Sequence, residues 1–311
     1  MSIGRKCLAE KVDVADLDCI YLSYDEPKKE EFWIKIQNMV PWAKRVDGID
    51  GSDAAHKAAA DASDTQRFVL IDGDNMPNPE FFDVTLDLTD DHTDCVFRWK
   101  AYNIVNGLMY GNGGLSCWTK NFVYNMKTHE NSDGADENNV EFCYDAKYFP
   151  MNNVYSTTHP NGDEFHAWRA GFREGVKMCL QKGAKPSLLE FNEMVHRSNF
   201  DRLSIWHNIG NDVEFGNYCI AGARYGTYRT MLTEWDYKEV QDFYHLGEIY
   251  KEWRNVDQTH VNELLSTRLG LQINEFTSEQ SKFFKKYYQQ THRQTDPMRL
   301  EIDAIRSAEG W

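Results

Sequence analysis

An alternation of short apolar runs and amphipathic segments in the first quarter of the chain constrains the fold more than any other feature. Three runs have the length and apolar character of buried strands, and two intervening segments place apolar residues at helical spacing. In chain order these segments are 17–24, 27–40, 43–48, 52–63 and 67–72. We expect Ser52 to cap the second helix. Such an alternation predicts a parallel sheet covered by helices on its faces.

The pattern changes twice after residue 72. Further strand-like stretches predict a mixed second half of the sheet, at 95–103, 110–119, 140–145 and 152–158. A polar, acidic segment at 127–139 predicts a loop. From about residue 163 the spacing is helical, at 163–183, 186–197, 235–255, 278–290 and 297–307. The Gly-rich segment 201–230 interrupts this pattern and predicts a tight loop around 222–226.

Composition excludes several classes of protein. No apolar run is long enough to cross a bilayer, and the first residues lack the apolar core of a signal peptide. The seven cysteines form no Cys-x-x-Cys pair, which predicts a reducing, cytoplasmic environment and neither a disulfide scaffold nor a structural zinc site. The net charge of −15 falls mostly in residues 1–180, which disfavours nonspecific nucleic-acid binding there and favours cations.

Two aspartates follow the third predicted strand, separated by one glycine. Alternation along an extended chain points the side chains of Asp72 and Asp74 the same way. Carboxylates so close repel each other unless a cation lies between them. The motif therefore predicts a divalent metal that also binds a diphosphate, at the edge where open α/β sheets bind ligands. The alternative is a solvated Asp-Gly turn that only closes the strand.

With this motif and its context, the chain resembles the GT-A class of nucleotide-sugar glycosyltransferases. The resemblance rests on HKAAADASDTQRFVLIDGDN, which ends in the Asp-x-Asp motif, and on GNGGLSCWTKN (111–121), which is similar to the Gly-Gly strand of that class. It covers roughly residues 17–180. The chain further resembles the glycosyltransferases of tailed bacteriophages that attach sugars to hydroxymethylated cytosine in DNA.

The resemblance implies an α/β fold with a Rossmann-like mixed sheet of the GT-A type, flanking helices and a mostly helical C-terminal region. It implies a catalytic domain at 1–183 that binds a UDP-sugar and an acceptor-binding region at 184–311. It implies Mn²⁺ or Mg²⁺ as the cofactor and double-stranded DNA containing 5-hydroxymethylcytosine as the acceptor. It implies the cytoplasm of an infected host cell as the location, and no membrane partner.

A histidine near the end of the catalytic domain is a further metal ligand in this class. His166 and His159 are the two candidates, and we favour His166 because polar and aromatic residues surround it. Alternatively, either histidine has a structural role, in which it caps a helix or packs against its neighbours. The expected metal ligands are thus Asp72, Asp74 and His166.

The class also places the donor's base at the end of the first strand. Tyr24 is suited to stack on the base and Asp25 to accept from a base N–H; alternatively, Asp25 caps a turn. Lys57 and Arg169 are expected to contact the nucleotide; alternatively, each lies on a solvated face of its helix. The residues expected to bind the nucleotide sugar are Ser23, Tyr24, Asp25, Lys57, Asp72, Gly73 and Arg169.

The acceptor is expected at two places. Gly113 and Gly114 have no side chains, so the backbone there can approach a ligand closely. Ser116 and Trp118 are two residues apart and share one face of the strand that follows. In the C-terminal region, cations alternate with aromatic residues, which suits phosphate contact and base stacking, although a helix with its aromatics in the core has the same pattern. The expected residues are Gly113, Gly114, Ser116, Trp118, Arg224, Lys285 and Lys286.

An inverting enzyme needs a carboxylate to deprotonate the acceptor hydroxyl, whereas a retaining one does not. The candidates for this base are Asp136, Glu137, Glu141 and Asp145. The sequence does not decide between the two stereochemical courses.

Other functions stay open at this level. The strongly negative net charge favours the same donor chemistry on a protein or glycan acceptor. A noncatalytic sugar- or nucleotide-binding module would need less than an Asp-x-Asp motif together with a Gly-Gly strand. A nucleotidyltransferase should have a Gly-rich loop after its first strand, and YLSYDEPKK is not one.

Overall fold

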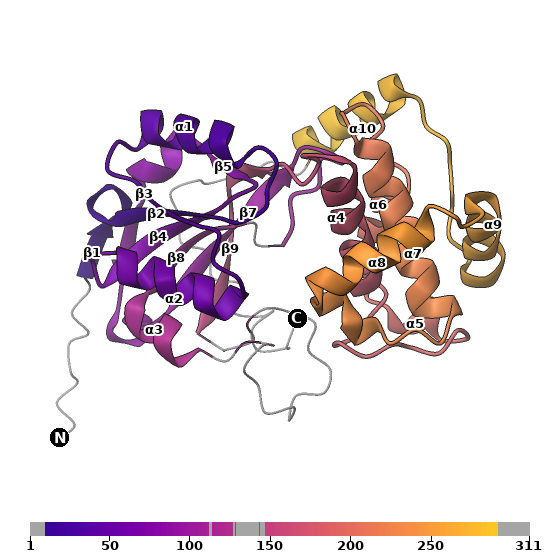
Figure 1. The fold of residues 1–311 in the computed structure, drawn as a ribbon, viewed down its shortest axis with the longest axis horizontal. Helices are drawn as coiled ribbons and strands as arrows, with labels where there is room; N and C mark the ends of the chain where they lie inside the picture. The colour runs from indigo at the N-terminus through magenta and orange to yellow at the C-terminus, as the bar shows by residue number, and fades with distance from the viewer. Residues whose placement is uncertain (1–9, 112–113, 127, 129–142, 144–146, 292–311) are drawn as a thin grey trace.

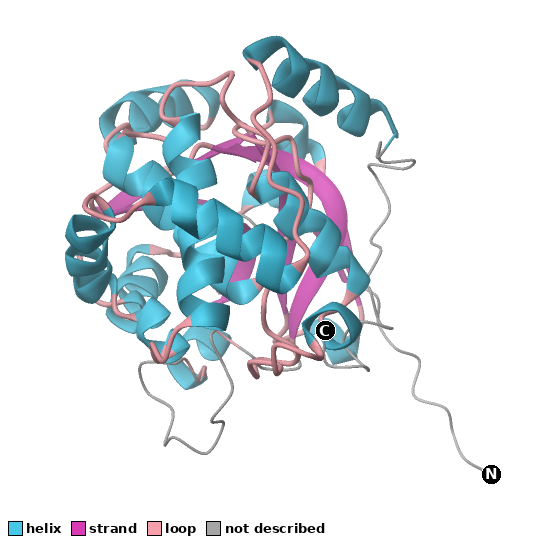
Figure 2. Cartoon of the chain, turned by 90° about the vertical axis from the view of Figure 1, so that its right-hand side faces the viewer, coloured by secondary structure: helices cyan, strands magenta, loops and turns pink. Residues whose placement is uncertain are grey.

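The computed structural model describes residues 10–111, 114–126, 128, 143 and 147–291. These residues form a sheet with helices against it and, beside the sheet, a body made of helices (Figure 1). Viewed from the side of the helical body, the helices lie in front of the curved strands (Figure 2). The predicted segments 140–145 and 297–307 lie largely or wholly outside the described residues.

The main sheet has seven strands and mixed directions, which confirms the predicted α/β class. Its order is β3 (Lys44–Asp47), β2 (Asp18–Ser23), β4 (Arg67–Asp72), β8 (Leu115–Thr119), β7 (Val96–Asn103), β9 (Tyr148–Thr158) and β5 (Asn75–Pro77). The first three strands run parallel, as their pattern predicts, and β8 lies antiparallel to β4. A separate antiparallel pair joins β1 (Glu10–Asp13) to β6 (Thr85–Leu88).

Both faces of the parallel strands are covered. Alternate residues of β4 point to opposite faces, so Val69 and Ile71 pack with α1 (Lys29–Met39) and Leu70 packs with α2 (Ser52–Ala62) and α3 (Lys120–Asn125). The predicted capping role of Ser52 is wrong. The cap is Gly51, whose φ of 86° favours glycine, and Ser52 is the first helical residue.

The helical body is built around two long helices packed against each other, α4 (Glu164–Lys177) and α7 (Gly216–Leu232). The shorter helices are α5 (Phe191–Met194), α6 (Arg197–Trp206), α8 (Phe243–Trp253), α9 (Gln258–Leu269) and α10 (Ser278–Thr291). The predicted helix at 186–197 is thus reduced to α5, and the one at 235–255 becomes a 3-10 turn followed by α8. Because α4 shares its core with α7 and α9, the expected boundary at residue 183 falls within the helical body.

The expectation of a tight Gly-rich loop around 222–226 is wrong, because α7 runs straight through it. A Cβ atom at Gly222 would lie 2.9 Å from the carbonyl carbon of Trp168 on α4, and one at Gly226 3.0 Å from that of Phe172. Gly171 and Gly175 of α4 face the α7 backbone in the same way. The glycines therefore permit two helix backbones to approach closely rather than forming a turn.

Among the described residues, every helix is too short or too polar to cross a membrane.

Candidate functional site

Three loops meet at the carboxyl ends of β2 and β4. The Tyr21 hydroxyl of β2 donates to the Gly73 carbonyl over 2.8 Å, and the His159 amide donates to the Asp74 carbonyl over 2.8 Å. Gly162 lies so close to Pro27 that a Cβ there would be 2.9 Å from the proline ring. The segments that follow β2, β4 and β9 therefore form one continuous surface at the edge where parallel sheets bind ligands.

Asp72 lies against Gly114, the residue before β8. Its amide donates to the Gly114 carbonyl over 2.7 Å, and a Cβ at Gly114 would overlap with the Asp72 carboxyl group. Burial raises the pKa of Asp72 to about 7, and the negative charges of Asp74 and Glu26 add to this effect. The carboxylate thus sits in a negative environment that a cation would relieve.

Asp74 and Glu26 supply that environment. The Asp74 carboxylate accepts from the Thr158 hydroxyl over 3.1 Å and from the Asn75 amide over 3.2 Å. The Glu26 carboxylate accepts from the Tyr24 backbone amide over 2.7 Å, and its Oε1 would lie 2.7 Å from a Cβ at Gly73. Burial raises the pKa of Glu26, with a further contribution from the charge of Asp74.

The predicted trio of metal ligands does not come together. In the described part of the chain, no three His, Cys, Asp or Glu side chains are grouped to hold a metal ion. His166 is instead held by Asp25 and Asp163, so its assignment as a ligand beside Asp72 and Asp74 is corrected. The two aspartates still fit Mg²⁺, because proteins bind this ion through one or two carboxylates while substrate phosphates complete its shell.

A cluster of paired charges lies at the first turns of α4. Asp163 caps this helix by accepting from the His166 amide over 2.7 Å, and also lies 2.9 Å from His166 Nδ1. Asp25 Oδ1 lies 3.5 Å from His166 Nε2, and Asp25 Oδ2 lies 3.3 Å from Arg169 Nη1. Bonding to His166 and the charge of Arg169 hold the pKa of Asp25 well below its usual range.

The carboxylates of this cluster favour the protonated form of His166. Burial works against protonation of His166, but Asp25 and Asp163 outweigh it and raise the pKa of the imidazole. The loop after β2 is thereby joined to the amino end of α4, which brings two expected donor-binding residues, Asp25 and Arg169, into contact.

The amino end of α8 adds a third group of residues, which sequence reasoning missed. The guanidinium groups of Arg169 and Arg173 lie 5.0 and 4.6 Å from the ring centroid of Phe243. The Tyr244 hydroxyl donates to Asp50 Oδ1 over 3.1 Å, and the Tyr24 hydroxyl approaches the same oxygen at 3.5 Å. Aromatic residues at the start of a helix do not differ in sequence from core aromatics, so nothing in the pattern pointed to them.

Two other expected donor-binding residues are engaged elsewhere. The buried Ser23 hydroxyl donates to Asp47 over 2.6 Å and accepts from Arg45. Lys57 forms an ion pair of 2.6 Å with Asp53 within α2. Of the residues expected to bind the nucleotide sugar, the loops bring together Tyr24, Asp25, Asp72, Gly73 and Arg169.

The predicted acceptor strand is only partly accessible. Gly114 contacts Asp72, whereas Gly113 lies outside the described residues. Trp118 is 1% exposed and packs against His56 and Phe122, while its indole N–H donates to the buried Ser116 hydroxyl over 2.8 Å. The expectation that Trp118 and Ser116 contact the acceptor is therefore wrong. Both side chains are part of the core.

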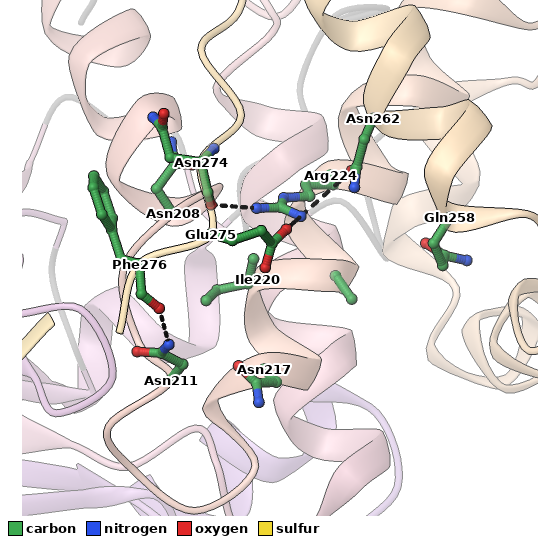
Figure 3. Close-up of a pocket in the computed structure, with 11 residues that line it drawn as sticks. Asn208, Asn211, Asn217, Ile220, Arg224, Gln258, Asn262, Asn274, Glu275 and Phe276 are labelled. Carbon is green, nitrogen blue, oxygen red and sulfur yellow. Dashed lines mark hydrogen bonds and ion pairs between the residues drawn. The ribbon is translucent and has the colours of Figure 1, made fainter. Parts of the chain in front are cut away.

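The predicted cations are also mostly buried. Lys285 is 8% exposed and forms an ion pair of 2.7 Å with the buried Asp212, so it is corrected to a structural residue, whereas Lys286 is exposed. Arg224 donates to the carbonyl of His207. It also donates to the Asn274 carbonyl and pairs with Glu275 over 3.1 Å (Figure 3). It lines a pocket of about 290 Å³ with the amides of Asn208, Asn211, Asn217, Gln258, Asn262 and Asn274.

The four candidates for the catalytic base, Asp136, Glu137, Glu141 and Asp145, lie outside the described residues.

No family model matches the chain, and comparisons with curated proteins and with solved structures find no match.

Proposed function

We propose that this chain is a GT-A-type, metal-dependent glycosyltransferase that moves a sugar from a UDP-sugar to 5-hydroxymethylcytosine in phage DNA. The observation that carries the proposal is the position of Asp72 and Asp74. Asp72 ends the parallel strand β4 and Asp74 follows it, beside Glu26 and within a surface that also carries Arg169. A group of carboxylates beside the arginines of α4 suits a diphosphate that arrives with a cation.

These two groups have different tasks in this proposal. Asp72 and Asp74 would hold Mn²⁺ or Mg²⁺, which would offset the negative charge of the diphosphate leaving group. Arg169 and Arg173 rise from consecutive turns of α4 and supply guanidinium groups that suit phosphate oxygens. Asp25 orients Arg169 through their ion pair of 3.3 Å. Gly114, which has no side chain, lets the chain before β8 approach the Asp72 carboxyl group closely.

DNA as the acceptor is supported by one face of α10 in addition to the resemblance. Lys282, Phe283, Lys286 and Tyr287 are all exposed on that helix, with Phe283 72% and Tyr287 59% accessible. Lysines suit phosphates and exposed rings suit stacking on unpaired bases, as a base displaced from a duplex would require.

A protein or glycan acceptor is the second candidate. The net charge of −15 repels a polyanion, and the burial of Arg224 and Lys285 removes two of the cations expected to contact phosphates. Both acceptor classes use the same donor chemistry, so one assay separates them.

The test is sugar transfer by the purified chain with Mn²⁺ and a panel of UDP-sugars. Hydroxymethylated DNA, unmodified DNA, protein and glycan acceptors are compared. Product on hydroxymethylated DNA alone supports the proposal, and product on protein or glycan alone supports the second candidate.

The matched variants are Asp74→Asn and Asp61→Asn, the latter an exposed aspartate of α2. Asp74→Asn should abolish transfer and Asp61→Asn should retain it. Equal activity of the two variants would remove Asp74 from the site, and the absence of transfer to every acceptor would overturn the proposed activity.

A further inference from the structure

The pocket around Arg224 is built from the helical body alone. Among the described residues, those that line it come from the first half of α7, the start of α9 and the segments 208–211 and 274–276. Six of the 11 lining residues carry a side-chain amide (Figure 3). Grooves between packed helices are ordinarily apolar, so this concentration of amides distinguishes the pocket from an ordinary packing defect.

Two helices each turn one polar face toward the pocket. Asn217, Ile220 and Arg224 of α7 are separated by three and four residues. Gln258 and Asn262 of α9 are four residues apart. Such spacings place side chains on the same side of a helix. The polar lining is therefore a property of two helix faces rather than of a single loop.

Two of the amides fix the shape of the pocket. Asn208 donates to the Gln272 carbonyl over 2.9 Å and accepts from the Asn274 backbone amide over 2.6 Å. Asn211 donates to the carbonyl of Phe276. These bonds hold the segment 272–276 against the loop that follows α6, so one wall of the pocket is formed in advance of any ligand.

Other amides that line the pocket are available for a ligand. Within the described part of the chain, the side-chain amides of Asn217 and Asn274 make no hydrogen bond. Asn262 uses only its oxygen, which accepts from Arg224 Nη1 at 3.5 Å. Asn262 and Asn274 lie on opposite sides of Arg224 and Glu275 (Figure 3). Because an amide both donates and accepts, the pocket offers both kinds of partner from more than one side.

The charges of the pocket are balanced. Arg224 is 7% exposed and pairs over 3.1 Å with Glu275, whose side chain is 84% exposed. A buried positive charge is thus matched by a negative charge at the rim, which favours neither an anion nor a cation. Phe276 is the only aromatic residue among the described residues that line the pocket. A flat nucleobase is usually held between aromatic or apolar side chains, so this lining does not favour a base.

We propose that this pocket binds one sugar ring of a neutral carbohydrate. A sugar hydroxyl both donates and accepts, which matches amides that do the same, and the carboxylate of Glu275 suits a donating hydroxyl. Ile220 and Phe276 offer apolar contact to the C–H groups of the ring. The volume of about 290 Å³ lies at the lower end of small-molecule pockets, roughly 300 Å³ and above, so it suits one ring rather than a long glycan.

This site is separate from the proposed donor site and does not depend on the proposed function. All of its lining residues follow residue 207, whereas Asp72, Asp74 and Arg169 precede it. A sugar linked to DNA and a sugar of a free or protein-linked glycan share the chemistry that the pocket recognises, and the experiment distinguishes these sources.

The experiment is saturation-transfer NMR of the methyl glycosides of glucose, galactose, mannose and arabinose with the full chain, without metal or nucleotide sugar. At least one glycoside should bind, and neither inorganic phosphate nor cytidine should displace it. The affinity is then measured by titration for wild type and for each variant.

Three variants locate the binding. Asn217→Ala combined with Asn274→Ala should weaken binding by at least about tenfold, the effect of two lost hydrogen bonds, and should fold because both side chains are exposed. Ala221→Trp should abolish binding by filling the pocket. Asn38→Ala combined with Asn192→Ala, two exposed asparagines of α1 and α5, is the matched control and should bind like wild type. Thermal midpoints establish that each variant is folded.

A further comparison identifies the source of the sugar. An oligonucleotide carrying glucosylated hydroxymethylcytosine is titrated beside its unglucosylated counterpart. Tighter binding of the glucosylated strand that is lost in the Asn217 and Asn274 double variant would support a DNA-linked sugar. Equal binding of the two strands, with glycoside binding lost in that variant, would support a free or protein-linked glycan.

Other results would overturn the inference. One is that none of the four glycosides binds the wild-type chain. Another is that the pocket variants bind the glycoside as wild type does, which would place the sugar elsewhere. Displacement of the glycoside by phosphate or by cytidine would reassign the pocket to an anion or to a base. Sugar transfer is not measured in any of these titrations, so the proposed function is tested independently.

Discussion

At the scale of single residues, Asp72 and Asp74 differ in what surrounds them. Asp74 accepts two side-chain hydrogen bonds, whereas Asp72 contacts the backbone of Gly114 and is close to the charges of Asp74 and Glu26. The sequence predicted that the two aspartates end a strand, because apolar runs and alternation are local features. It could not predict Glu26, since that carboxylate arrives through a loop contact with Gly73.

We expect Asp72→Asn to abolish sugar transfer while raising the thermal midpoint of the metal-free protein. An amide removes a buried negative charge from the neighbourhood of two others, which stabilises the folded state by about 1 kcal/mol or more. Calorimetry and the transfer assay on the same preparation measure both effects. A lower thermal midpoint would show that the Asp72 carboxylate serves the fold.

His207 gives a prediction on pH, because this fully buried imidazole is held neutral. Burial and the charge of Arg224 lower its pKa to about 3, while Nε2 lies 2.9 Å from the Thr227 hydroxyl. Below pH 6.5 only the unfolded chain takes up this proton, so folding stability falls as the pH falls. The loss between pH 7 and pH 5 should be about 2 kcal/mol.

The measurement is urea unfolding at pH 7 and pH 5, with His207→Gln as the comparison. The variant should be less stable at pH 7 but should lose about 2 kcal/mol less than wild type on acidification. Equal losses in the two proteins would assign the acid sensitivity to other groups.

At the scale of secondary-structure elements, the contact between α4 and α7 organises the helical body. The segment 201–230 was predicted as an interruption because glycine weakens an isolated helix. The low helix propensity of glycine is outweighed by packing here, because Gly222 and Gly226 allow the backbone of α4 to approach closely. The helix 278–290, whose apolar face follows simple spacing, was predicted nearly as it is, whereas the helix predicted at 163–183 begins as expected but ends at Lys177.

Gly222→Ala should lower the free energy of unfolding by about 1–3 kcal/mol, because the added methyl group overlaps with the backbone of Trp168. Gly247→Ala in α8 is the matched control, since nothing lies within 4 Å of its added Cβ. That control should stabilise the protein by about 0.5–1 kcal/mol through helix propensity. Chemical denaturation of both variants decides, and equal effects would refute the close-packing argument.

At the scale of the whole molecule, an acidic protein exposes a small basic and aromatic face on α10. The sequence predicted this helix but not which side faces outward. Ser281 and Lys285 point inward, the latter to Asp212, and the opposite side is left to solvent. Orientation of a helix depends on its partners, and Asp212 lies far away in the sequence.

Lys282→Ala combined with Lys286→Ala should reduce the salt dependence of DNA binding by up to about 2 units in the log–log slope, about 0.9 for each lost phosphate contact. Lys11→Ala combined with Lys35→Ala, two exposed lysines of the sheet half, is the control and should leave the slope unchanged. Fluorescence anisotropy across a salt series measures the slope. An unchanged slope in the α10 variant would favour the protein or glycan acceptor.

The backbone contact between α4 and α7 has a consequence for how this protein can change over evolutionary time. Arg169 projects from α4, and the place of that helix is set by close main-chain contact at Gly222 and Gly226 in addition to the side chains that it buries. Apolar residues of the helical body that do not pack against α4 can therefore vary in size without displacing the arginine. An acceptor surface can diversify on such a body while the donor end keeps its geometry.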